Sequence, residues 1–276
     1  MSHKVVLGKV DYLNCFPIYY PIEQDIISTP CEIKKGPPSL LNREFISDAI
    51  NITPISSIEY ARNWNICKVV PNLSISAEGT VMSILLFSKV DFKELQGKSI
   101  AVTTSSATSV VLLKILMQEA LGVEATYMPE KPDLDEMLTN HDAALLIGDD
   151  ALKGKVLSNQ YHILDLGELW YRFTGFPMVY ALWVVKESMS TSLSEKFSAT
   201  ITGLEQAKQW QLEQKEFLIK TAESNYPFEE KIIRDYYSTI QYDLGNRHIE
   251  GLKLFYYYAS KIGILDKRYD LNFWSD

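Results

Sequence analysis

The chain has 276 residues, with 27 lysine and arginine against 35 aspartate and glutamate residues and a formal net charge of −8. This acidic balance argues against a nucleic-acid partner, because such binders need a basic surface for the phosphate backbone. The hydrophobic content of 46% is ordinary for a globular protein, and the length is sufficient for two domains with their own cores.

The cysteines and the first residues indicate a cytoplasmic protein. Cys15, Cys31 and Cys67 are odd in number and form no C-x-x-C pair, so neither a disulfide framework nor a zinc site is indicated. The N-terminal segment turns polar at Lys9 and Asp11, which leaves no room for the apolar part of a signal peptide. No apolar run approaches the roughly 20 residues that span a bilayer. We therefore expect a cytoplasmic protein without a membrane partner.

In chain order, strand-like and helical patterns alternate through the first half. Short apolar runs predict strands at residues 5–10, 50–53, 80–89, 99–103, 125–128 and 143–147. Helical spacing of apolar residues predicts helices at residues 15–23, 36–45, 56–61, 110–121 and 132–138. Alternation of this kind predicts an α/β fold with largely parallel sheets.

The second half contains one more long strand pattern, at residues 176–186, and is helical after it. The later helices are expected at residues 193–220, 228–240 and 248–262. We interpret the strands at 80–89 and 176–186 as a pair of crossover strands that form a hinge between two lobes.

This interpretation divides the chain into two lobes with a cleft between them. Lobe one would hold residues 1–88 and 180–276, including the C-terminal helices, and lobe two would hold residues 89–179. Ligands of such folds lie between the lobes, at the carboxyl ends of the strands. We expect the cleft wall to include some of the aromatic residues Phe16, Trp170, Phe176 and Tyr180.

Hydroxyl and amide side chains gather at the turns that lead from strands into helices. Helix N-termini carry free N–H groups and a partial positive charge, so they bind anions. Any one of these turns is better explained as a helix cap, and Asn14 and the acid Asp149 have that alternative too. Several turns that meet at one cleft would bind a small carboxylate compound. The expected binding residues are Ser56, Ser57, Thr104, Ser106, Thr108, Ser109, Gly148 and Asp149.

Motifs of several cofactor-dependent enzymes are missing. The chain has no G-x-G-x-x-G, G-x-S-x-G or H-E-x-x-H sequence. Its four histidines, His3, His141, His162 and His248, lie far apart and include no short pair of metal ligands. We expect neither a cofactor nor a bound metal.

The same turns belong to a series of motifs that runs through the chain. In order, these are DYLNCFP at 11–17, PISSIEYA at 54–61, SAEGTVMS at 76–83, TTSSATS at 103–109, LIGDDAL at 146–152, DLGELW at 165–170, TGFPMVYALW at 174–183 and YDLG at 242–245. Together they resemble the chorismate dehydratases of menaquinone biosynthesis, the futalosine pathway. Before Pro54 the family usually has Gly-x-Leu-Asp, where this chain has residues 48–51 as Asp-Ala-Ile-Asn.

The resemblance implies a two-lobed, type II periplasmic-binding-protein-like fold and a lyase that dehydrates chorismate to 3-[(1-carboxyvinyl)oxy]benzoate. Such an enzyme binds two carboxylates, stabilises a delocalised anion and keeps its pocket dry. The resemblance places Asn14 and Ser83 at the reacting centre as hydrogen-bond donors. No motif supplies a histidine base, so the enolpyruvyl carboxylate of the substrate is the expected base.

Two alternatives remain open from the sequence. One is an enzyme like the 1,4-dihydroxy-6-naphthoate synthases, which resemble this family in fold but carry a histidine base. The other is a non-catalytic protein that binds a small carboxylate. Turnover of chorismate, as opposed to binding alone, distinguishes an enzyme from a receptor. The oligomeric state is not indicated.

Overall fold

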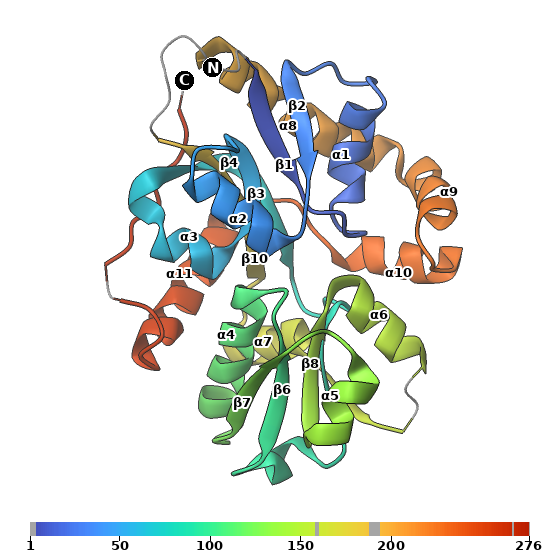
Figure 1. Cartoon of the computed structure of the whole chain (residues 1–276), viewed down its shortest axis with the longest axis vertical. Coiled ribbons are helices and arrows are strands. Elements are labelled where there is room, and N and C mark those ends of the chain that lie inside the picture. The colour runs from blue at the N-terminus through green and yellow to red at the C-terminus, as the bar shows by residue number, and fades with distance from the viewer. Residues whose placement is uncertain (1–3, 158–159, 188–193, 267, 276) are drawn as a thin grey trace.

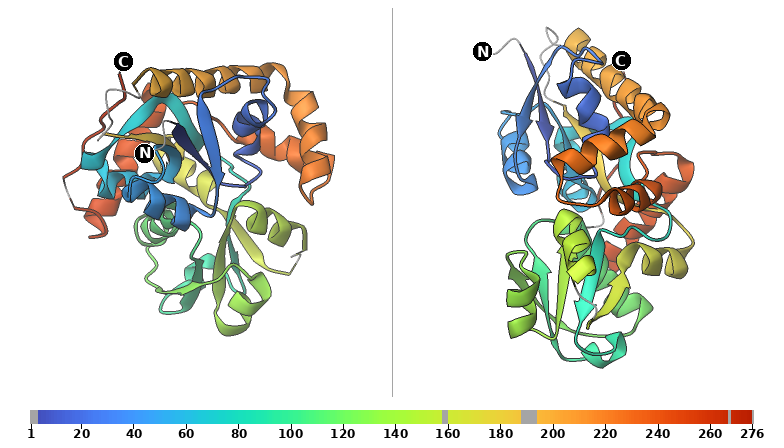
Figure 2. Two further views of the ribbon diagram at one scale, coloured as in Figure 1. Left: turned by 45° about the horizontal axis from the view of Figure 1, so that its top comes forward. Right: turned by 90° about the vertical axis from the view of Figure 1, so that its right-hand side faces the viewer.

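The computed structural model describes residues 4–157, 160–187, 194–266 and 268–275. Its chain forms two lobes, each built on a five-stranded sheet with helices against it (Figure 1). Helices from the C-terminal part belong to the first lobe and reach down to its junction with the second (Figure 2). Within the described residues, no helix is both long enough and apolar enough to cross a membrane.

The first sheet has the strand order β2-β1-β3-β10-β4. Strand β1 pairs in parallel with β2 and β3, whereas β10 is antiparallel to both β3 and β4. The strands of this sheet are β1 (Val5–Lys9), β2 (Cys31–Lys35), β3 (Ile52–Ser56), β4 (Cys67–Ala77) and β10 (Met178–Lys186).

The second sheet repeats this plan with the order β7-β6-β8-β5-β9. Strand β6 is parallel to β7 and β8, and β5 is antiparallel to β8 and β9. In each sheet, one antiparallel strand is therefore inserted beside a set of parallel strands. The strands of this sheet are β5 (Ile84–Ser88), β6 (Ser99–Thr103), β7 (Thr126–Glu130), β8 (Ala143–Ile147) and β9 (His162–Asp165).

The helices begin and end at recognisable signals. Ser106 accepts a hydrogen bond from the Ser109 amide at the start of α4, and Gly175 adopts the left-handed conformation that ends α7. The α-helices are α1 (Phe16–Glu23), α2 (Pro38–Ile46), α3 (Ser57–Arg62), α4 (Ala107–Ile115), α5 (Leu134–Asn140), α6 (Gly148–Leu157), α7 (Leu166–Thr174), α8 (Ser194–Glu213), α9 (Lys215–Asn225), α10 (Glu230–Thr239) and α11 (Asn246–Lys261). Shorter helical segments are η1 (Trp64–Ile66), η2 (Phe92–Leu95) and the π-helical η3 (Leu116–Ala120).

Most predicted elements are present, and two strands match residue for residue, β6 and β8. The predicted helix at 193–220 is wrong as a single element, because Gln214 separates α8 from α9; its first residue lies outside the described residues. Strand β4 has no counterpart among the predictions. Its sequence contains Pro71 and Asn72, the latter at a φ of 56°, and its pairing with β10 shifts register twice, so no regular alternation marks it.

The two strands interpreted as a crossover pair lie in different sheets and are not hydrogen-bonded to each other. Strand β10 pairs with β3 and β4, while β5 pairs with β8 and β9 in the other sheet. The chain passes between the sheets through residues 78–83, before β5 rather than after it. The division into lobes stays a prediction, and we propose that its first boundary lies in these crossover residues, since β5 is hydrogen-bonded within the second sheet.

The Asp165 carboxylate holds the crossover residues in place. Asp165 lies at the end of β9 and caps α7, accepting bonds from the Gly167 and Glu168 amides at 2.9 and 3.1 Å. The same carboxylate accepts bonds from the Val81 amide at 3.1 Å and the Met82 amide at 2.7 Å. Met82 has a φ of 64°, a conformation that costs energy for a side chain of this kind and persists only where neighbours impose it.

Gly167 allows α7 to lie directly against the crossover residues. A Cβ atom at this position would be 2.6 Å from the Gly79 carbonyl oxygen and 2.7 Å from the Tyr180 hydroxyl. We expect Gly167→Ala to lower the free energy of unfolding by about 1–3 kcal/mol, because overpacking against backbone cannot be relieved by a side-chain movement. Chemical denaturation measures the change.

Glu168→Ala is the matched control on the same helix. It removes only a partly exposed ion pair with Arg172, and such i,i+4 pairs contribute roughly 0.3–0.5 kcal/mol. Equal stability of the two variants would show that the close neighbours of Gly167 do not exclude a side chain at this position.

Candidate functional site

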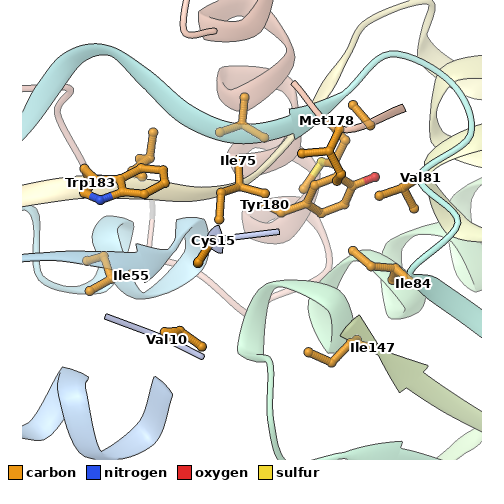
Figure 3. Close-up of a cluster of buried hydrophobic side chains, with 14 of the residues drawn as sticks. Val10, Cys15, Ile55, Ile75, Val81, Ile84, Ile147, Met178, Tyr180 and Trp183 are labelled. Atoms are coloured by element: carbon orange, nitrogen blue, oxygen red, sulfur yellow. The ribbon is translucent and has the colours of Figure 1, made fainter. Parts of the chain in front are cut away.

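A cavity lies between the two lobes and takes its wall from both. The empty space within it is about 670 Å³, including the part that opens to solvent. Figure 3 shows much of its apolar wall, with Ile84 and Ile147 on one side and Val10 and Ile55 on the other. The lining residues are Val10, Tyr12, Asn14, Cys15, Pro38, Pro54, Ile55, Ser56, Ile75, Val81, Ser83, Ile84, Ser105, Ser106, Ser109, Ile147, Gly148, Tyr180, Ala181 and Ile240.

The polar groups in this wall are neutral. None of the described residues that line the cavity has an aspartate, glutamate, lysine, arginine or histidine side chain. Burial raises the pKa of the Cys15 thiol to about 12, and it also raises the pKa of Tyr12 and of Tyr180. These ionisable groups therefore keep their protons near neutral pH.

Three polar atoms in the wall are buried without a hydrogen-bond partner. They are the Asn14 Oδ1 atom, the Ser56 hydroxyl oxygen and the Tyr180 hydroxyl oxygen. A buried polar group without a partner costs about 1–3 kcal/mol, so most such groups in folded proteins are satisfied. Three such atoms in the wall of one cavity give a polar ligand groups with which it can complete the bonding.

Asn14 lies in the loop between β1 and α1. The expected alternative, that its side chain caps α1, is wrong, because Cys15 is the N-cap residue and no side chain caps the helix. Its position is fixed through its own backbone, since the Asn14 carbonyl accepts a bond from the Tyr242 hydroxyl at 2.8 Å. The amide side chain is therefore available to the cavity.

Ser83 is the last crossover residue before β5 and is 3% exposed. Its hydroxyl oxygen accepts a bond from the Tyr236 hydroxyl at 3.0 Å, and its carbonyl accepts one from the Gly148 amide at 2.7 Å. Asn14, from the loop after β1, and Ser83, from the crossover residues, thus line the same cavity.

The two serines at the start of α3 face different ways. Ser56 lines the cavity, whereas the Ser57 hydroxyl is buried and donates to the Val179 carbonyl at 2.7 Å. The cavity wall therefore includes Ser56 and leaves out Ser57. The sequence predicted both serines as binding residues, because it does not show that the Ser57 hydroxyl bonds to a carbonyl of β10.

The hydroxyls of the turn before α4 also face different ways. Ser106 and Ser109 line the cavity and lie 3.0 Å apart through their hydroxyl oxygens. The Thr108 hydroxyl instead accepts a bond from the Ile58 amide at 3.0 Å, which joins α4 to α3 across the lobes. Thr104 is not among the lining residues.

At the start of α6, Gly148 lines the cavity and Asp149 does not. Gly148 has a φ of 58° and packs against the ring of Tyr12 from the other lobe. Asp149 lies in the first turn of the helix, and its Oδ1 atom accepts a bond from the Leu13 amide at 3.3 Å. Burial raises the pKa of Asp149 to about 6. Asp149 is thus a contact between the lobes.

Some residues of the site were not found from the sequence. Tyr12 and Ser105 line the cavity, and Tyr236 contacts Ser83 from α10. Of the four aromatic residues expected in the wall, Tyr180 lines it, and Phe16, Trp170 and Phe176 do not. The sequence around a buried tyrosine in a helical pattern does not show whether the residue belongs to a site or to the core.

The histidines lie elsewhere. His141, His162 and His248 do not line the cavity, and His3 is outside the described residues. In the part of the chain that the structure describes, no group of three histidine, cysteine, aspartate or glutamate residues could hold a metal ion.

Comparison with known proteins identifies the family. A family described as menaquinone biosynthesis matches residues 5–261. The chain belongs to this menaquinone biosynthesis family. One similar curated member is a chorismate dehydratase from Thermus thermophilus, which is 30% identical over 66% of this chain and 69% of the relative. Another is a chorismate dehydratase from Campylobacter jejuni, which is 31% identical over 71% of this chain and 75% of the relative.

Solved structures confirm the two-lobed fold predicted for the family. A protein from Archaeoglobus fulgidus superposes with a TM-score of 0.76 at 19% identity, covering 96% of this chain and 99% of its own. The alkanesulfonate-binding protein of Xanthomonas axonopodis pv. citri, bound to MOPS, superposes with a TM-score of 0.70 at 16% identity. The match covers 97% of this chain and 96% of that protein. This menaquinone biosynthesis protein therefore has the periplasmic-binding-protein-like fold.

The contact at Asp149 predicts a dependence of stability on pH. Its pKa of about 6 lies above the ordinary value, so the folded state binds this proton more tightly than the unfolded state does. The charged carboxylate then lowers stability above about pH 6, and this cost fades as the pH falls toward about 4. Asp149→Asn keeps an oxygen for the Leu13 amide. It should melt at a higher temperature than the wild type at about pH 7.5, with a smaller difference at about pH 4.5.

Asp135→Asn provides the control, since Asp135 is an exposed residue in the first turn of α5. Thermal melts of all three proteins are recorded across this pH range. A gain for Asp149→Asn that is the same at both pH values would contradict the prediction.

Proposed function

We propose that the protein is a chorismate dehydratase, a lyase that removes water from chorismate to give 3-[(1-carboxyvinyl)oxy]benzoate. Family membership over residues 5–261 and two curated relatives of this name support the proposal. The observation that carries it is the cavity, which combines apolar walls, neutral polar groups and three unpartnered buried polar atoms.

The chemistry suits such a cavity. The reaction takes the proton from ring carbon C3 and the hydroxyl from C4, and the ring becomes aromatic. Negative charge spreads through the diene toward the ring carboxylate before the hydroxyl leaves. Fixed donors in a water-excluded site stabilise this charge more strongly than water does, because they are already oriented and the surroundings are weakly polar.

Several polar residues around the cavity then have distinct roles. Asn14 and Ser83 donate hydrogen bonds at the reacting centre. Ser56 on one lobe and the pair Ser106 and Ser109 on the other bind the substrate carboxylates. Gly148 allows the backbone to approach the ligand closely. Ser57, Thr104, Thr108 and Asp149 support the wall without touching the substrate.

The base is the enolpyruvyl carboxylate of chorismate itself, which reaches the C3 proton through a six-membered arrangement. The ionisable side chains in the wall, Tyr12, Cys15 and Tyr180, all have raised pKa values and hold their protons. They are therefore donors, and a protonated thiol or phenol does not remove a proton from carbon near neutral pH. A cytoplasmic location goes with this role as a prediction from the sequence.

Purified protein should convert chorismate without an added metal or nucleotide. The measurement follows loss of the diene absorbance and identifies the product by mass, with a sample kept in a chelator alongside. Binding of chorismate without conversion would favour the receptor alternative. Activity lost in the chelator and restored by a divalent cation would contradict the metal-free mechanism.

Asn14→Asp tests the donor role. Aspartate beside a dianionic substrate adds repulsion and replaces N–H donors by an acceptor, so turnover should fall by about a hundredfold or more. Asn42→Asp is the control, because the Asn42 Oδ1 atom is also buried without a partner but lies outside this cavity. It should keep its turnover when both variants are assayed below their melting temperatures. Normal activity in Asn14→Asp would remove Asn14 from the reacting centre.

A further inference from the structure

Tyrosine hydroxyls from α10 and the chain after it hold the residues of the reacting centre. The Tyr236 hydroxyl donates to the Ser83 hydroxyl oxygen at 3.0 Å. The Tyr237 hydroxyl donates to the Leu13 carbonyl at 3.2 Å, and the Tyr242 hydroxyl to the Asn14 carbonyl at 2.8 Å. Helix α10 thus contacts both sides of the cavity, although it lies more than 140 residues after Ser83 in the chain.

The bond from Tyr236 determines what the Ser83 hydroxyl can do. A serine hydroxyl has one proton to donate and two lone pairs. Tyr236 occupies one lone pair, and the hydrogen bonds of the described residues include no acceptor for the Ser83 proton. Because Ser83 lines the cavity, its proton can be donated into that space.

The surroundings of Tyr236 keep it a donor. Its side chain is 1% exposed, and burial raises its pKa, an effect that the hydrogen bond with Ser83 partly offsets. The hydroxyl therefore keeps its proton near neutral pH. It contacts Ser83 from behind the wall, since Tyr236 is not itself a lining residue.

We propose that Tyr236 is a positioning residue, whose hydroxyl orients Ser83 so that the serine donates its proton in a hydrogen bond to the C4 hydroxyl that leaves. This inference rests on the proposed function. In the reaction, the C3–H bond breaks and its proton passes to the enolpyruvyl carboxylate. The electron pair left on C3 forms the C3–C4 double bond, and the C4–O bond breaks. The leaving hydroxide, held by Ser83, combines with that proton to give water.

Tyr236→Phe removes the hydroxyl and keeps the ring that fills the core. We expect kcat to fall by about 10- to 100-fold, less than for loss of a direct donor, because Ser83 is still present but no longer oriented. KM should stay within about threefold of the wild-type value, since the carboxylate-binding serines are untouched.

A double-mutant cycle separates positioning from a structural effect. If Tyr236 acts through Ser83, Tyr236→Phe should lower kcat by less than about twofold in a Ser83→Ala background. The same loss in both backgrounds would overturn the proposal, as would an unchanged kcat in Tyr236→Phe alone.

Tyr60→Phe is the matched control for loss of a buried tyrosine hydroxyl. The Tyr60 hydroxyl donates to the Asp270 carbonyl and accepts from the Asn272 amide, both at 2.9 Å, and Tyr60 does not line the cavity. It should lose thermal stability and keep kcat. An equal loss of kcat in Tyr60→Phe would mean that Tyr236 matters only for folding. Absence of turnover in the wild type would instead contradict the proposed function.

Discussion

The rest of the structure depends on the carboxylate of Asp165. This one side chain accepts backbone hydrogen bonds from the start of α7 and from the crossover residues Val81 and Met82. Burial raises its pKa and these bonds lower it, so the protein offsets the cost of desolvating the carboxylate with backbone donors that would otherwise lack partners. Because the crossover residues join the two sheets and end at Ser83, the same interaction positions the lobes and one side of the cavity.

The proposed function requires this cavity to bind an anion without a cationic side chain in its described lining. A buried lysine or arginine would need its own compensation in an empty site, whereas hydroxyl and amide groups carry a smaller desolvation cost. Hydroxyls at Ser56, Ser106 and Tyr180, with the amide of Asn14, provide such donors among apolar side chains. The negative charge of the proposed substrate spreads during the reaction. Oriented neutral dipoles can stabilise it without holding it at one carboxylate of the substrate.

Contacts between the lobes arrive from several parts of the chain. Asp149 on α6 accepts a bond from the Leu13 amide, and Thr108 on α4 accepts one from the Ile58 amide. Helix α10, which lies beside the junction of the two lobes in Figure 1, adds the tyrosine contacts behind the cavity. The C-terminal helices therefore do more than cover the first sheet, since they connect its loops to the crossover residues.

The sequence by itself determined the local features: the buried strands β6 and β8, the caps such as Ser106, and the neutral turns around Asn14 and Ser56. Apolar runs and capping residues act on their immediate neighbours, so they can be recognised without a fold. Only the tertiary structure decided that Ser56 faces the cavity while Ser57 binds β10, that β5 belongs to the second sheet, and that Tyr236 meets Ser83. These outcomes depend on hydrogen bonds between residues far apart in the chain, and no local pattern specifies which distant group a hydroxyl will find.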